Sequence, residues 1–156
     1  LATPMTGKTY GTFFLPEVGD EVLVGFERGD IRAPFVVGSL WNDTRKPPVS
    51  NADGRNDIRT IRTRKGHSLR FEDGLKGRVR LELNDGKAIT IDDGGITIDA
   101  GNGNRIVVAS ASGATTIEAA STLRIRAPQV AIEASGTVDI TAGGTLTLRG
   151  ALIAIN

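Results

Sequence analysis

From Ile89 to the end of the chain, pairs of apolar side chains two positions apart recur at intervals of seven to ten residues. Residues two positions apart on a β-strand face the same side, so each pair predicts one short strand with one buried face. Glycines such as Gly95 and Gly136 stand between the pairs, as is typical of tight corners. The repeat predicts stacked strands. The positions expected to face a common interior are Ile89, Ile91, Ile96, Ile98, Ile106, Val108, Ile117, Leu123, Ile125, Val130, Ile132, Val138, Ile140, Leu146 and Leu148.

The number of chains that close this interior follows from the length of the repeat. A single-chain solenoid with three sides per coil would obtain only about three coils from nine strands, which is the minimum for a stable repeat protein. Three intertwined copies would close the prism at every level, with each chain rising about 4.8 Å per strand. We therefore predict an intertwined triple-stranded β-helix, a homotrimeric needle, over residues 66–156.

Composition agrees with an all-β fold. The chain has 20 glycines, its aromatic content is 4%, and it has no cysteine, which excludes disulfides and thiolate metal sites. No apolar run approaches the roughly 18 residues of a membrane-spanning helix. The chain begins with leucine, so we expect it to be the later part of a longer protein.

The first 65 residues divide into two parts. Apolar runs at 22–26 and 35–40, joined by a polar turn, predict a hairpin within a partial barrel of the oligomer-binding (OB) type over residues 1–45, with at least one strand missing upstream. Residues 46–65 contain paired prolines and no sustained period, and we expect a basic neck or linker there. Residues 51–80 hold nine basic and four acidic groups.

Two other classes of function can be weighed from the residues. The basic stretch on a barrel fold could indicate a nucleic-acid-binding OB module, but stacking aromatics are scarce around it. A carbohydrate-active or carbohydrate-binding β-solenoid should carry clustered carboxylates and aromatic platforms, whereas Trp41 and Tyr10 lie outside the repeat. His67 is the only histidine, and Ser68 beside it would face the opposite side of a strand. We predict no catalytic residue, cofactor site or metal site.

The segment PEVGDEVLVGFERGDIRAPFVVGSLWN, followed by PP and IRTIRTRKGHSLRFED, resembles the VgrG family and the related baseplate spike proteins of contractile phages and extracellular injection systems. The resemblance implies an OB-type barrel followed by a trimeric needle, and full-length members also carry an upstream hub domain. The residues that carry this barrel signature are Pro16, Gly19, Asp20, Glu21, Val22, Gly29, Asp30, Pro34, Gly38, Leu40 and Asn42.

The same resemblance implies a function. It predicts a non-enzymatic spike that punctures a target membrane, transmits the force of contraction and meets the baseplate hub or tube through the upstream part. Such a spike is assembled in the cytoplasm into a phage-tail-like particle or secretion machine and is then ejected. The apolar end at Ile153, Ile155 and Asn156 needs a cover, for which the family suggests a conical PAAR-repeat tip protein. No nucleic-acid partner is expected.

Overall fold

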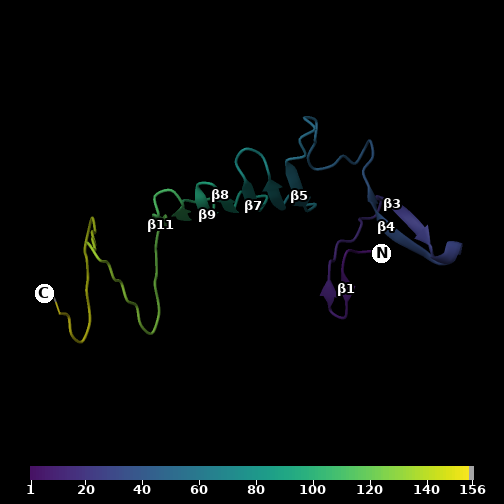
Figure 1. Cartoon of the computed structure of the whole chain (residues 1–156). Coiled ribbons are helices and arrows are strands. Elements are labelled where there is room, and N and C mark those ends of the chain that lie inside the picture. Colours follow the sequence, from purple (N-terminus) through teal and green to yellow (C-terminus); the bar gives the residue numbers. More distant parts are fainter. Residues whose placement is uncertain (155–156) are drawn as a thin grey trace. The chain divides into compact units, whose positions relative to one another are not determined.

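A computed structural model describes residues 1–154 of the chain (Figure 1). The chain divides into two compact units, residues 1–120 and the residues from Ser121 onward. In the described part, regular structure consists of eleven β-strands and one short 3-10 turn. The prediction of an all-β fold is confirmed.

Two separate hairpins make up the N-terminal part. β1 (Thr6–Gly7) pairs with β2 (Tyr10–Gly11), and β3 (Glu21–Phe26) pairs with β4 (Pro34–Leu40). The 3-10 turn η1 (Glu27–Gly29) begins the connection between β3 and β4. Both longer strands lie within one residue of the predicted ones. A bulge shifts their register between Leu23 and Val24, which strengthens the local twist of the hairpin.

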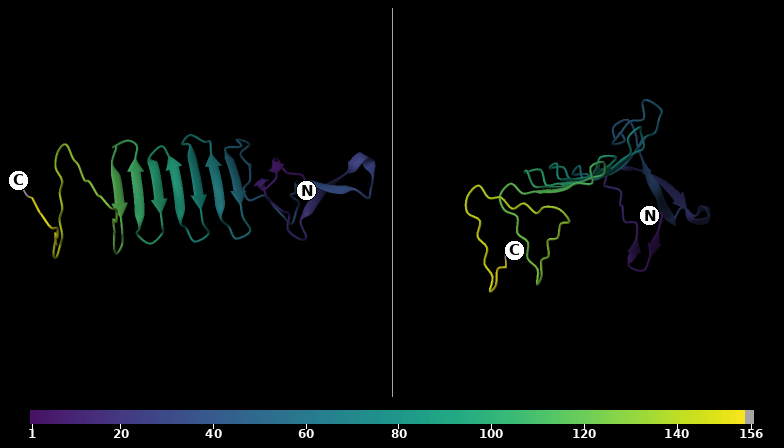
Figure 2. Two further views of the ribbon diagram at one scale, coloured as in Figure 1. Left: turned by 90° about the horizontal axis from the view of Figure 1, so that it is seen from below. Right: turned by 60° about the vertical axis from the view of Figure 1, so that its left-hand side comes forward.

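A single seven-stranded antiparallel sheet follows, in which each strand pairs with the next one in sequence (Figure 2). Five of the six connections have five residues, and β8 and β9 are joined by two, which are ordinary lengths for hairpin loops. The strands are β5 (Ile58–Arg62), β6 (Ser68–Glu72), β7 (Arg78–Glu82), β8 (Ala88–Asp92), β9 (Gly95–Asp99), β10 (Arg105–Ala109) and β11 (Thr115–Glu118).

This sheet differs from the sequence-based prediction in two respects. First, β5 lies inside residues 46–65, which were expected to form a linker. Ile58 and Ile61 are three positions apart and therefore face opposite sides, so the segment shows no clean alternation of apolar and polar residues. Second, β8 to β11 pair within the chain, whereas interlacing was expected from the start of the repeat. Their short loops make local antiparallel pairing the simpler outcome.

The second unit contains no regular secondary structure in its described residues. From Ser121 to residue 154 the backbone forms no helix or strand, and its described groups make no backbone hydrogen bond within the chain. The trace runs as extended segments that turn back on themselves (Figure 2). Extended backbone with no pairing of its own leaves its N–H and C=O groups free for partners outside the chain.

The turn between β8 and β9 depends on Gly95. This residue has φ 131°, and a Cβ atom added to it would lie 1.9 Å from the carbonyl oxygen of Val108 on β10. Any side chain here would require both a rare backbone conformation and a shift of the neighbouring strand.

We predict that Gly95→Ala destabilises the sheet. The strained backbone conformation alone costs about 1–3 kcal/mol, and the steric clash with Val108 adds to that cost. Gly77→Ala is the matched control, since Gly77 has an ordinary φ and a Cβ atom added there would meet no other atom within 4 Å. Denaturant unfolding of both variants measures the difference. Equal stability of the two would contradict the close approach at Gly95.

Candidate functional site

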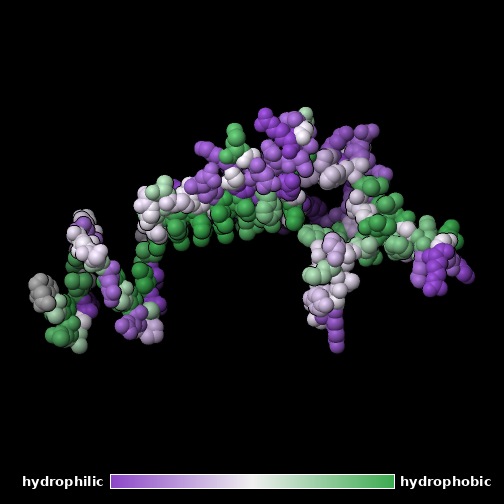
Figure 3. All heavy atoms as spheres, viewed as in Figure 1, coloured by the Kyte–Doolittle hydropathy of each residue, from purple (hydrophilic) through white to green (hydrophobic). Residues whose placement is uncertain are grey.

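Apolar side chains form two rows across one face of the seven-stranded sheet. The cross-strand register joins the residues of each row as direct neighbours from one strand to the next. We call this set of twelve residues the apolar stripe. The first row is Ile61, Leu69, Leu81, Ile89, Ile98, Ile106 and Ile117, and the second row is Phe71, Val79, Ile91, Ile96 and Val108. Figure 3 shows apolar residues along one side of the sheet and polar residues along the other.

The apolar stripe is only half-covered. Except for Leu69, which is intermediate, its members keep between 36% (Val79) and 55% (Ile117) of their surface exposed. Among the described residues the only buried hydrophobic one is Ala88, at 7% exposure. A continuous apolar surface of this size marks an interaction site. Completing its burial would contribute about 1 kcal/mol per side chain, or about 10 kcal/mol per chain.

The predicted interior residues fall into two groups. Seven of them, from Ile89 to Ile117, lie together in the apolar stripe. The other eight lie in the second unit, where they are between 51% and 69% exposed. This second group consists of Leu123, Ile125, Val130, Ile132, Val138, Ile140, Leu146 and Leu148. The predicted interior did not include the members of the stripe on β5, β6 and β7, although the alternation in 68–82 could have extended the repeat to β6 and β7.

Ion pairs lie on the opposite face of the sheet, on β6 and β7. Arg78 donates two hydrogen bonds of 2.8 and 3.1 Å to Glu72 Oε2, and its Nη2 also donates to Oε1 at 3.0 Å. Two residues further along β7, on the same face, Arg80 pairs with Glu82 at 3.0 Å and donates to Thr90 Oγ1 on β8. The hydrogen bonds from Arg78 hold the pKa of Glu72 below its ordinary value, and those from Arg80 do the same to the pKa of Glu82. This face is therefore suited to contact with water.

Both lowered pKa values predict acid sensitivity. Ionised Glu72 and Glu82 stabilise the fold above their ordinary pKa near 4.5, and this contribution is lost as the pH falls through their lower folded values. Thermal unfolding between about pH 6 and about pH 3 should show a steeper loss of stability for the native chain than for Glu72→Gln. Glu118→Gln, which removes a carboxylate with no ion pair in the described residues, should keep the native slope. An unchanged slope in Glu72→Gln would contradict the assignment.

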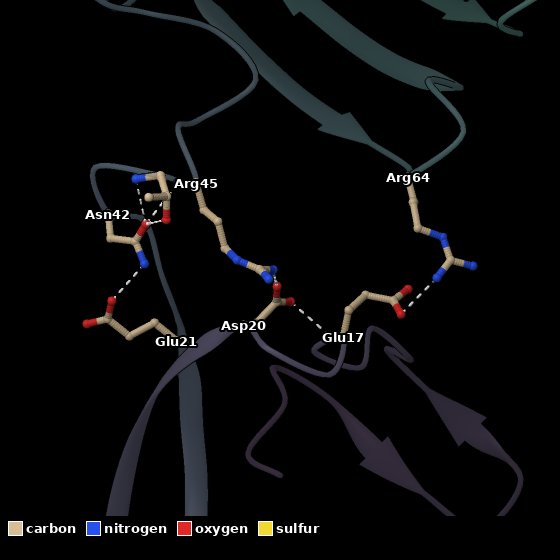
Figure 4. Close-up of polar contacts among 7 residues, drawn as sticks. Glu17, Asp20, Glu21, Asn42, Arg45 and Arg64 are labelled. Atoms are coloured by element: carbon tan, nitrogen blue, oxygen red, sulfur yellow. Dashed lines mark hydrogen bonds and ion pairs between the residues drawn. The ribbon is translucent and has the colours of Figure 1, made fainter.

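Residues of the barrel signature meet in a polar cluster beside β3 and β4 (Figure 4). Asn42 donates to Glu21 Oε2 at 2.8 Å, and its Oδ1 accepts the backbone N–H of Arg45 at 2.8 Å. The Arg45 guanidinium in turn pairs with Asp20, whose carboxylate accepts the N–H of Glu17 at 2.8 Å. The chain after β4 is thereby fastened to the loop before β3.

Three members of this cluster were not predicted. Glu17 and Arg45 are not signature residues, and Arg64 pairs with Glu17 at 2.9 Å from a turn 47 residues away. No local pattern in the sequence indicates the contacts of Arg45 or Arg64. Asp30, in contrast, is a signature residue whose contacts stay within its own turn. It pairs with Arg32 at 2.9 Å, and the hydrogen bonds from Arg32 lower the pKa of Asp30. These signature residues hold loops in place and do not converge on a reactive centre.

The remaining candidate residues show no chemistry of their own. His67 Nδ1 accepts the backbone N–H of Asn84 at 3.2 Å, which is a structural contact in a turn. Within residues 1–154 there is no group of three or more side chains suited to hold a metal ion. No helix in that range could cross a membrane. Of the predicted tip residues, Ile153 is 50% exposed, whereas Ile155 and Asn156 lie outside the described residues.

Comparison with known families assigns both parts of the first unit. Residues 1–41 match the family described as the type VI secretion system/phage-baseplate injector OB domain. Residues 59–112 match the phage baseplate V C-terminal trimerisation domain. The second match begins within β5 and runs past β10, so it covers most of the sheet that carries the apolar stripe.

A curated relative agrees with these families. The chain is 44% identical over 48 residues to the type VI secretion system spike protein VgrG5 of Pseudomonas aeruginosa. The aligned part is 31% of this chain and 6% of that protein, so the chain spans a small fraction of this relative's length.

Proposed function

Because the chain is a VgrG-like baseplate spike protein, we propose that three copies join through their apolar stripes to form the rigid needle of a contractile injection system. The observation that carries the proposal is the half-exposed apolar face of the sheet, most of which lies within the residues that match a trimerisation domain. Three such sheets facing one axis would bury the three stripes against one another. Each chain would then be stable in this region only as part of the trimer.

The second unit supports the same assembly by a different route. Its backbone has no partners within the chain, and unpaired backbone groups cannot be buried without large cost. We propose that residues 121–154 interlace with the two other copies, so that strands from all three chains alternate along each side. The side chains of Leu123, Val130 and Val138 would then point to the axis together with the other predicted interior residues of this unit. The intertwined triple-stranded β-helix is thus proposed for this unit, after three sheets that each belong to one chain.

The proposed role is mechanical. Interlaced strands cannot separate without breaking many hydrogen bonds at once, so an axial load would be shared by all three chains during contraction. Such a spike would puncture a target membrane and would need no catalytic residue. It would be assembled into a phage-tail-like particle or secretion machine in the cytoplasm and then ejected. We further propose that residues upstream of this chain join the baseplate hub, and that a PAAR-repeat tip protein covers the end near Ile153.

A charge placed in the apolar stripe tests the trimer. Ile98→Asp would bring three carboxylates onto a dry axis, at a cost of several kcal/mol per ion. We predict that light scattering gives about three times 16.4 kDa for the native chain, and a smaller mass or aggregation for Ile98→Asp. Thr97→Asp is the matched control, because the neighbouring residue faces the opposite, polar side of the same strand and should leave the trimer intact. A monomeric native chain, or trimers in both variants, would refute the proposal.

A further inference from the structure

A hollow of about 400 Å³ lies on the polar face of the sheet, beneath Pro48 and Val49. Its floor consists of two cross-strand rows on β5, β6 and β7, and its sides are the β5–β6 and β7–β8 turns. We call it the collar pocket. The rows of its floor are Thr60, Arg70 and Arg80 in one and Arg62, Ser68 and Glu82 in the other.

The collar pocket is strongly positive. Four cationic side chains line it, Arg62, Lys65, Arg70 and Arg80, and Glu82 is the only carboxylate among its lining residues. Arg80 is already occupied, because its guanidinium is bound to Glu82 and Thr90. Arg62 and Lys65, in contrast, form no ion pair with any residue that the structure describes. Two full positive charges therefore remain uncompensated at this hollow.

Arg70 adds a third cation to this hollow, beside Arg62 and Lys65. It stands directly opposite Arg80 in the register, and like charges in that position destabilise a sheet. Its Nε is shielded from solvent and lies 2.7 Å from Glu72 Oε1, so this ion pair balances part of the charge of Arg70. An anion in the collar pocket would offset the repulsion.

We propose that the collar pocket binds a phosphate group through Arg62, Lys65 and Arg70. Arginine forks and lysine ammonium groups are the usual protein partners of phosphate oxygens. The lining contains no aromatic residue, which argues against stacking of a nucleic-acid base. The volume is within the range of small-ligand sites, so it can hold a phosphate carried by a larger molecule, either a soluble phosphate ester or a lipid headgroup.

Access to the collar pocket in the assembly rests on the proposed function. The pocket and the apolar stripe lie on opposite faces of the same strands, because their residues alternate along β5, β6 and β7. If three stripes meet at the axis, three collar pockets open outward. A needle would thus carry three equivalent phosphate sites around its circumference.

The test is calorimetric titration of the 156-residue chain with inorganic pyrophosphate at near-physiological salt. Arg62→Gln/Lys65→Gln should weaken binding at least about tenfold, because two charge-assisted contacts are lost. Arg55→Gln/Lys76→Gln removes the same charge outside the collar pocket and should change affinity less than about twofold. Lys65→Gln alone, in an exposed turn, should shift affinity in the same direction as the double variant with less risk to folding.

Vesicles of phosphatidylcholine with and without phosphatidylglycerol identify the source of the phosphate. Pocket-dependent binding to the anionic vesicles assigns a lipid headgroup, and pocket-dependent binding to pyrophosphate alone assigns a soluble phosphate ester. No binding of the native chain to either probe would overturn the proposal. Equal weakening in both double variants, for pyrophosphate or for a single-stranded oligonucleotide, would also overturn it, since that indicates a diffuse basic surface. An unchanged mass by light scattering in every variant separates these outcomes from a failure of the trimer.

Discussion

The apolar stripe has no second layer to pack against within its own sheet, and this constraint shapes most of the chain. A sheet with one apolar face is stable only when that face is covered, usually by helices or by another sheet. Here the described residues supply no α-helix, and the stripe remains half-exposed over seven strands. The match to a trimerisation domain supports sister copies of the chain as the cover.

The backbone is paired within the chain in the sheet but not after Ser121 in the described residues. Between Ile58 and Glu118, loops of two to five residues let each strand fold back on the previous one, and the backbone hydrogen bonds are completed within the chain. After Ser121 the alternation of apolar residues continues, but no intrachain pairing accompanies it in the described residues. In the proposed assembly, a sheet that each chain completes for itself would set the alignment of three chains before their later segments interlace. The apolar pattern is shared by both regions, whereas only the first has backbone hydrogen-bond partners within the described chain.

Sequence reasoning captured the apolar pattern better than the pairing. Ile89, Ile98 and Ile106 were correctly expected to share one face, because a period of two residues determines which side a strand residue occupies. The same pattern does not indicate whether the next strand belongs to the same chain, so the antiparallel pairing of β8 to β11 was not predicted. β5 was missed because Ile58 and Ile61 interrupt the alternation. The contacts of Arg45 and Arg64 depend on loops that fold back over many residues, which no local signal reports.

The central claim is that residues 121–154 obtain their backbone hydrogen bonds from other copies of the chain. Hydrogen–deuterium exchange of the assembled protein measures this directly, because amides in paired strands exchange only when the pairing opens. The account predicts slow exchange for amides of residues 123–154 in the trimer, comparable to that of β8 and β9, and rapid exchange when the trimer is dissociated. Rapid exchange of these amides in an intact trimer would contradict the account, since they would then be an unpaired tail.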